Sequence, residues 1–304
     1  MRYNPANDLA DVIVGKLPFG ADRTSAVWDR SNTYIFGGRS IAGPLDLVLR
    51  YDPVSDTVDI MAATLPSQRE DTSATWDGAN AYIFGGRDVA GSLIDEIVRY
   101  TPGPAGGAVA VMAATLPTPR SLTSAVQVGA DIYIFGGLDA TGFLDEIVRY
   151  SPATDTVTVM QNTLLNHLGN MGVVSDGTHA YLFGGTGCRN EIVRYTPASD
   201  RIMIMQAVLP SGRQDSSAIW DGTNAYIFGG RASARLDEIV RYDPSLDTAL
   251  VPDRDGDEVS GGTDPLAGDE DGNGIPDGFE DPDGDEVPNA IERYCRRSAI
   301  MGHF

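Results

Sequence analysis

Residues 81–86 read Ala-Tyr-Ile-Phe-Gly-Gly, a short apolar run that stops at two glycines. The string Tyr-(Ile/Leu)-Phe-Gly-Gly occurs five times in the 304 residues, ending at Gly38, Gly86, Gly137, Gly185 and Gly230. Successive copies are 48, 51, 48 and 45 residues apart. A period of this length indicates a repeat architecture, in which each unit buries its apolar faces against its neighbours.

Each repeat predicts four short strands. In the second repeat we expect them at 73–76, 81–84, 96–100 and 109–112. Asp77-Gly78-Ala79-Asn80 predicts a hairpin turn between the first two, because these residue types tolerate the backbone angles of a tight turn. The third strand carries Arg-Tyr at its end in every repeat, from Arg50-Tyr51 to Arg241-Tyr242.

A four-stranded unit of about 50 residues that carries a diglycine resembles the Kelch repeat. The resemblance extends over about residues 2–250 and implies an all-β fold, a five-bladed Kelch-type β-propeller within residues 1–250. Kelch repeats usually carry a tryptophan in the fourth strand, where this chain has Val58, Val109 and Val157. We expect these β-branched residues to pack between blades instead.

The sequence begins inside a repeat, because residues 2–18 match residues 50–66. Asp11–Val14 is therefore a spare fourth strand. We predict that it pairs with the third strand of the last blade, near Glu238–Tyr242, and closes the ring. A competing interpretation is that the sequence is a fragment of a propeller with six or more blades.

The charge is concentrated in one segment. The chain has a formal net charge of −21, and residues 253–292 contain fifteen Asp or Glu against one Arg. This distribution argues against nucleic acid as a partner. No apolar run approaches the ~18 residues of a membrane span. The two cysteines, Cys188 and Cys295, lie far apart, which favours two free thiols.

Residues 269–280 fit the calcium-loop template D-x-[DN]-x-[DN]-G-x5-E in full. Calcium takes six to eight oxygen ligands, and the template supplies them at fixed positions. The middle loop would use Asp269, Asp271, Asn273, the Ile275 carbonyl, Asp277 and Glu280. Two imperfect copies flank it, with Asp253, Asp255, Asp257 and Asp264 before it and Asp281, Asp283, Asp285, Asn289 and Glu292 after it.

The close-set Asp-x-Asp-Gly-(Asp/Asn) strings are similar to thrombospondin type 3 repeats. The resemblance implies that residues 251–292 form a compact string that binds Ca²⁺, and that the protein is extracellular or at the cell surface. The first residues lack the basic-then-apolar pattern of a signal peptide. We expect the tail, residues 293–304, to include a short helix. The alternative is a solvated acidic linker or tail.

No catalytic motif is present in the repeats, and the chain has only three histidines. We therefore predict a protein- or ligand-binding scaffold rather than an enzyme. The alternatives are an enzyme acting on carbohydrate or sugar acid at the channel mouth, and a purely structural repeat protein.

Several cations recur in loops that a propeller would gather on one rim, where they could bind an acidic peptide, a carbohydrate or a sugar acid. The candidate ligand-binding residues are Arg23, Arg69, Arg120, His167, Arg189 and Arg213. The alternative is that each arginine pairs with a nearby aspartate such as Asp71 or Asp215 and fastens its own blade.

Overall fold

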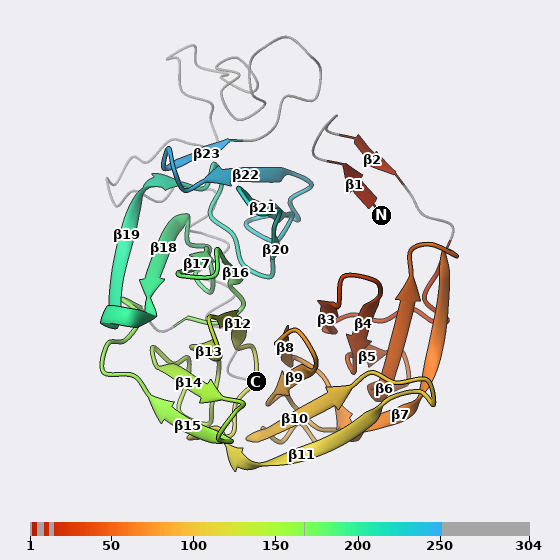
Figure 1. Cartoon of the computed structure of the whole chain (residues 1–304). Coiled ribbons are helices and arrows are strands. Elements are labelled where there is room, and N and C mark those ends of the chain that lie inside the picture. The colour runs from red at the N-terminus through yellow and green to blue at the C-terminus, as the bar shows by residue number, and fades with distance from the viewer. Residues whose placement is uncertain (1, 5–8, 12–14, 167, 251–304) are drawn as a thin grey trace. The chain divides into compact units, whose positions relative to one another are not determined.

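The structure is a computed structural model that describes residues 2–4, 9–11, 15–166 and 168–250. Across these ranges the fold is all-β, with a single 3-10 turn, η1 (Pro197–Ser199). No helix in the described ranges is long and apolar enough to cross a membrane. Five four-stranded antiparallel blades follow one another along the chain, as the sequence predicts (Figure 1). The predicted calcium segment and tail, 251–304, lie outside the described residues.

Each blade has its strands in chain order across the sheet. Blade 1 contains β3 (Ser25–Trp28), β4 (Thr33–Phe36), β6 (Gly43–Asp52) and β7 (Thr57–Arg69), with β5 (Arg39–Ser40) paired to the start of β6. Blade 2 contains β8 (Ser73–Trp76), β9 (Ala81–Phe84), β10 (Glu96–Thr101) and β11 (Ala108–Thr115). Blade 3 contains β12 (Ser124–Val128), β13 (Asp131–Phe135), β14 (Ile147–Ser151) and β15 (Thr156–Val159). Blade 4 contains β16 (Gly172–Ser175), β17 (Ala180–Phe183), β18 (Glu191–Thr196) and β19 (Arg201–Val208). Blade 5 contains β20 (Ser217–Trp220), β21 (Ala225–Phe228), β22 (Ile239–Asp243) and β23 (Thr248–Leu250).

The chain divides into two compact units. The first holds blades 1 to 3, residues 197–200, and an N-terminal hairpin of β1 (Arg2–Asn4) and β2 (Leu9–Asp11). The second holds blades 4 and 5. Within the first unit the first strands of successive blades adjoin, β3 with β8 and β8 with β12. Within the second unit β16 adjoins β20 in the same way.

The predicted strands of the second repeat agree with the structure to within a few residues at the strand ends. The predicted turn is also present, because the Asp77 amide donates to the Asn80 carbonyl over 3.0 Å. The Asp77 carboxylate accepts the amides of Ala79 and Asn80 at 2.8 and 2.6 Å. A side chain that satisfies backbone donors in this way fixes the turn locally.

The core lies between blades. Tyr34 and Phe36 of β4 contact the ring of Tyr100 from β10, with centroids 5.2 and 5.5 Å apart. The fully buried Tyr100 packs with Ile83 and other residues of blade 2 in the same cluster. Burial raises the pKa of Tyr100 to about 12. The same aromatic arrangement recurs between blades 2 and 3 and between blades 4 and 5.

Two of the three valines that stand in the usual tryptophan position have the predicted role. Val109 packs against the cluster between blades 1 and 2, and Val157 against the cluster between blades 2 and 3. A β-branched side chain thus fills this position between the blades.

The predicted strand exchange with the last blade is wrong. The edge of β22 is occupied by β23, with Arg241 opposite Leu250 and Asp243 opposite Thr248. Blade 5 therefore completes itself with the residues that follow it in sequence. Residues 9–11 pair with β1, and residues 12–14 lie outside the described ranges.

The diglycine ends the second strand because the backbone of the next connection passes against it. In blade 2 the Gly85 amide donates to the Glu96 carbonyl at 3.1 Å, and the Gly86 amide donates to the Arg120 carbonyl at 2.9 Å. Both glycines have positive φ, 59° and 105°. A Cβ on Gly85 would overlap the Arg120 carbonyl oxygen. Only glycine combines this backbone conformation with this approach.

We expect Gly85→Ala to destabilise the protein by more than about 2 kcal/mol, because it adds backbone strain and pushes away the connection. Gly20→Ala is the control, since Gly20 has no atom within 4 Å of an added Cβ, and its effect should stay within about 0.5 kcal/mol. Urea unfolding measures both. Equal stability of the two variants would contradict the role given to the diglycine.

Candidate functional site

Three of the candidate arginines are buried rather than displayed on a rim. Arg69, Arg120 and Arg213 have no exposed surface. Their Nη2 atoms lie 2.7, 2.7 and 2.5 Å from carboxylate oxygens. The partners are Glu96, Glu146 and Glu238, in that order, at or just before the third strand of the following blade. The expected aspartate partners are thus replaced by glutamates.

These arginines join successive blades. The Arg120 side chain binds Glu146 in blade 3, while its carbonyl accepts the Gly86 amide of blade 2. Arg69 does the same between blades 1 and 2, and Arg213 between blades 4 and 5. We call this arrangement the Arg–Glu lock. Because the guanidinium is enclosed and bound to its carboxylate, these three residues belong to the scaffold and not to an exposed ligand site.

The sequence pattern that predicts the lock is the occurrence of an arginine before a blade together with a glutamate at the start of the third strand of that blade. Before blades 2, 3 and 5 an arginine stands four residues after the leucine of Leu-Pro, and each of these blades carries Glu at the start of Glu-Ile-Val-Arg-Tyr. Before blade 1 both members are replaced, by Ala21 and Leu47. Before blade 4 the arginine position is Leu168, and Glu191 instead has Arg189 of its own blade 3.7 Å away. Before blades 1, 2, 3 and 5 the arginine and the glutamate are thus present or absent together, as a buried ion pair requires, and before blade 4 only the arginine is replaced.

We expect Glu146→Leu to destabilise the protein more than Arg120→Met. The first leaves a buried guanidinium unpaired, at a cost of about 3 kcal/mol or more. The second leaves a carboxylate that is 32% exposed and can be hydrated, at a cost of about 1–2 kcal/mol. The double variant should recover most of the loss, since it reproduces the apolar pair before blade 1. Denaturant unfolding of the four proteins tests this, and strictly additive losses would contradict a lock.

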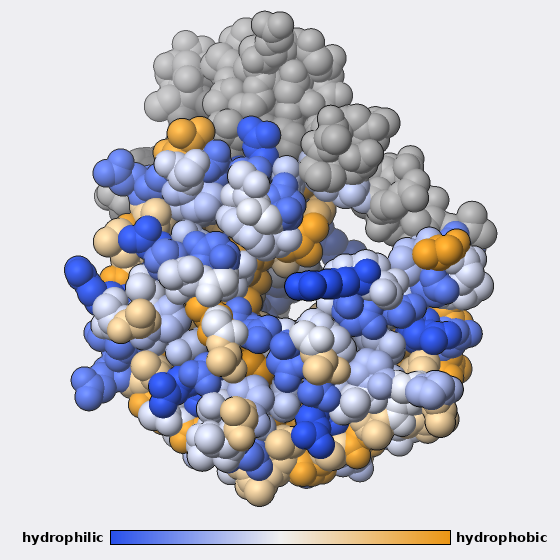
Figure 2. All heavy atoms as spheres, viewed as in Figure 1, coloured by the Kyte–Doolittle hydropathy of each residue, from blue (hydrophilic) through white to orange (hydrophobic). Residues whose placement is uncertain are grey.

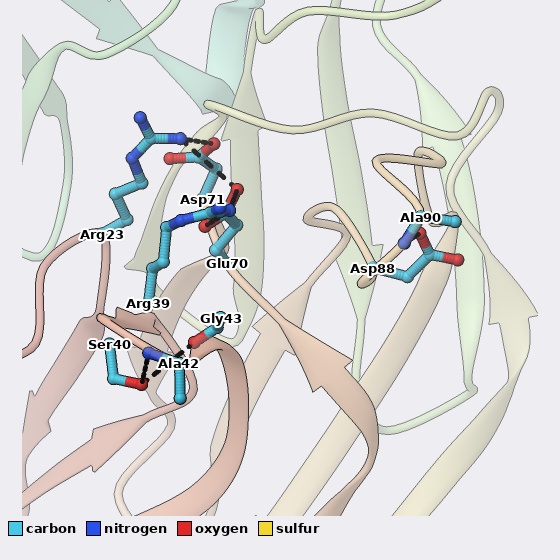
Figure 3. Close-up of polar contacts among 9 residues, drawn as sticks. All are labelled: Arg23, Arg39, Ser40, Ala42, Gly43, Glu70, Asp71, Asp88 and Ala90. Atoms are coloured by element: carbon cyan, nitrogen blue, oxygen red, sulfur yellow. Dashed lines mark hydrogen bonds and ion pairs between the residues drawn. The ribbon is translucent and has the colours of Figure 1, made fainter.

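The exposed site lies where blades 1 and 2 meet in the first unit (Figure 3). Arg39 Nη1 lies 3.0 Å from both carboxylate oxygens of Glu70. Arg23 Nη1 lies 3.4 Å from Glu70 Oε1 and 3.4 Å from Asp71 Oδ2. Two guanidinium groups thus share two adjacent carboxylates. We call these four residues the rim cluster.

Backbone pairing positions the rim cluster. Arg39 directly follows the first diglycine, and its amide and carbonyl pair with those of Asp22. The Asp71 amide donates to the Arg23 carbonyl over 3.2 Å, which joins the connections that enter blades 1 and 2. Arg23 and Asp71 both have left-handed φ, 53° and 56°. Leu122 has the same conformation before blade 3, so this backbone form belongs to the repeat.

The charges of the rim cluster are layered. Arg23 and Arg39 are 50% and 48% exposed, whereas Glu70 and Asp71 are 6% and 10% exposed. The carboxylates therefore lie beneath the guanidinium groups and orient them. The surface offered to a partner is rich in N–H donors, although the cluster as a whole is close to neutral. Such an arrangement suits binding of a carboxylate group.

A loop and a cavity adjoin the rim cluster. Ser40 Oγ accepts the Ala42 amide at 3.2 Å and donates to the Gly43 carbonyl at 3.3 Å, which folds the loop after Arg39. Ile41 at its tip is fully exposed. An open cavity of about 430 Å³ is lined by Gly20, Ala21, Asp22, Arg39, Ser40 and Ile41. The loop therefore offers a partner an apolar tip next to polar groups.

The corresponding loop of blade 2 is held in a similar way. The Asp88 carboxylate accepts the amide of Ala90 at 2.8 Å (Figure 3) and also the amide of Ser92 at 2.8 Å. The side of the first unit that is visible in Figure 2 is mostly hydrophilic, with scattered apolar side chains. A partner that binds this face would meet mainly polar groups.

The remaining candidates are not part of the rim cluster. Arg189 is in the second unit, with the Glu191 carboxylate close by. His167 and all the predicted calcium ligands lie outside the described residues. Over the described ranges, no group of three or more His, Cys, Asp or Glu side chains is placed to hold a metal ion. Cys188 is disulfide-bonded, which corrects the expectation of a free thiol there.

Comparison with known proteins identifies one stretch of the chain. Residues 119–163 match the Kelch motif. This stretch contains Arg120, the diglycine at 136–137, Glu146 and the four strands of blade 3. No curated protein matches the chain.

Proposed function

We propose that this chain is a Kelch-type propeller scaffold that binds a partner protein through the rim cluster of blades 1 and 2. The Kelch motif in blade 3 and the shared strand order of all five blades support the scaffold role. Kelch propellers typically bind proteins. The observation that carries the choice of surface is the layering of the rim cluster, in which two half-exposed guanidiniums stand over two buried carboxylates.

The partner chemistry follows from the exposed groups. A guanidinium offers several donors in a planar fork. Glu70 engages Nη1 of both arginines, and Asp71 engages Nη1 of Arg23. The outward donors suit an acidic side chain of a peptide, and the exposed Ile41 suits a neighbouring apolar residue. The chain is acidic overall, so the attraction acts at contact range rather than by long-range steering. Loops on a rigid scaffold are a common place for such recognition.

We expect a fluorescein-labelled hexaglutamate peptide to bind the protein and to bind Arg39→Gln at least about fivefold more weakly, because a guanidinium–carboxylate contact is lost. Arg50→Gln is the matched control, since Arg50 is 37% exposed and pairs with Asp59 on the outer strands of the same blade. Fluorescence anisotropy at 50 mM salt measures both variants. Equal weakening by the two substitutions, or no binding by the parent protein, would sink the assignment of the rim cluster.

We further propose that residues 251–292 bind calcium and that the protein acts outside the cell. The support is the sequence: residues 269–280 place oxygen-bearing side chains at positions one, three, five, nine and twelve, with Gly274 at the sixth. Weak sites of this kind suit the millimolar calcium of extracellular fluids. Bound calcium would also offset the repulsion among fifteen acidic groups.

Calorimetric titration of the full chain with CaCl₂ should show binding, and Asp271→Ala should remove the contribution of the middle loop. Glu270→Ala is the matched control, because Glu270 is the second residue of the loop and the template places no ligand there. If the parent does not bind calcium, or if both substitutions have the same effect, the proposed ligand pattern is wrong.

A further inference from the structure

Arginine follows the diglycine in three of the five blades, as Arg39, Arg87 and Arg231. Two of these arginines are bound to carboxylates. Arg39 Nη1 lies 3.0 Å from Glu70 Oε2, and Arg231 Nη2 lies 3.2 Å from Asp215 Oδ2. The third, Arg87, belongs to blade 2 and adjoins the rim cluster through its backbone. Its amide donates to the Glu70 carbonyl at 2.9 Å, and its carbonyl accepts the Glu70 amide at 3.0 Å.

The position that corresponds to Glu70 carries no charge in the connection that enters blade 3. Ser121 stands there, directly after the lock arginine Arg120. Ser121 has no exposed surface, and its hydroxyl has no hydrogen-bond partner in the part of the chain that the structure describes. Arg87 therefore has a short neutral side chain at the place where Arg39 has a glutamate.

The position that corresponds to Asp215 is already used. Its counterpart in the connection that enters blade 2 is Asp71, and the Asp71 carboxylate lies 3.4 Å from Arg23 Nη1 in the rim cluster. Over the described residues, the Arg87 guanidinium forms no hydrogen bond or ion pair, and the residue is partly exposed. A guanidinium that is not neutralised by its own chain keeps all its donors for a carboxylate from outside.

The loop after Arg87 places an apolar side chain close to this guanidinium in sequence. Val89 at the tip of the loop is 65% exposed. The Asp88 carboxylate accepts the Ala90 amide at 2.8 Å (Figure 3), so the carboxylate holds its own loop in a turn. The backbone pairing with Glu70 fixes the base of the same loop. The guanidinium and the apolar tip thus stand on a well-ordered support.

Blades 1 and 2 share this pattern of an arginine, one polar residue and an exposed aliphatic tip, at residues 39–41 and 87–89. In blade 3 the corresponding residues, 138–140, read Leu-Asp-Ala, so the pattern ends at blade 2 within the first unit. Two neighbouring loops that each pair a cation with an aliphatic side chain match a ligand in which acidic and aliphatic side chains alternate.

We propose that Arg87 and Val89 form a second subsite of the recognition surface, which binds a carboxylate side chain of the partner together with the aliphatic side chain beside it. The proposal rests on the binding of an acidic partner at the rim cluster, and it adds that the partner segment alternates acidic and aliphatic residues. The incoming carboxylate takes the role at Arg87 that Glu70 has at Arg39. Because Arg87 has no carboxylate to share, it contributes more to affinity than Arg39 does.

A fluorescein-labelled peptide of sequence Glu-Leu-Glu-Leu-Glu-Leu tests the carboxylate contact. We expect it to bind the full chain, and Arg87→Gln to raise its Kd at least about tenfold, because an unshared guanidinium is lost. Arg231→Gln is the matched control, since Arg231 also follows a diglycine but is held by Asp215, and it should leave the Kd unchanged. Fluorescence anisotropy at 50 mM salt measures the parent and both variants.

The apolar contact has its own readout. The parent should bind the alternating peptide about threefold or more tightly than hexaglutamate, because the leucines bury apolar surface. Val89→Ser should remove this preference. Val54→Ser, at a residue that is 93% exposed in the turn between β6 and β7, should retain it. Equal behaviour of the two serine variants would contradict the alternating ligand.

Comparison of the arginine variants separates this proposal from the one on which it rests. If Arg87→Gln binds like the parent while Arg39→Gln is weakened, the second subsite is wrong and the rim cluster stands. If Arg87→Gln is weakened while Arg39→Gln and Arg50→Gln behave alike, the rim cluster is wrong and the carboxylate site at Arg87 stands. A parent protein that binds neither peptide overturns both.

Discussion

The close approach of a connecting backbone to the diglycine is the constraint on which each blade junction depends. The Gly86 amide reaches the Arg120 carbonyl at 2.9 Å only because neither glycine has a side chain. That contact holds Arg120 where its guanidinium meets Glu146. The backbone contact with blade 2 and the ion pair with blade 3 both involve Arg120, so this residue connects the two blades.

The exposed rim depends on the same junction. Arg39 follows the first diglycine directly, and Glu70 follows the buried Arg69. The scaffold that fastens blade 1 to blade 2 therefore also brings Arg39 to Glu70 at 3.0 Å. The proposed recognition surface is fixed at its base by this junction, whereas the loop tips can differ between blades, because Ile41 and its counterparts do not participate in the lock. Function on such a fold depends on the residues at those tips.

The N-terminal strands could pair with the last blade or with each other, and the sequence alone does not distinguish the two arrangements. Residues 2–18 match the third and fourth strands of a repeat, and the sequence therefore predicts that Asp11–Val14 pairs with the last blade. The structure gives that edge to β23, because the chain after Asp243 turns back over four residues, 244–247, and pairs from Thr248 onward. A local hairpin forms without the entropy cost of joining distant segments. The same preference for a local hairpin explains why β1 pairs with β2.

The sequence by itself determined the strands, their number in each repeat and the turns between them, since alternation and Asp-Gly turns act over a few residues. It also located the calcium template at 269–280, which rests on spacing alone. Only the tertiary structure decided which arginines are buried and which are exposed. Arg69 and Arg39 each stand at a place where arginine recurs in other repeats, but one points into a junction beside Glu96 and the other lies over Glu70 at the surface. Burial is set by residues from the neighbouring blade, and no local pattern contains them.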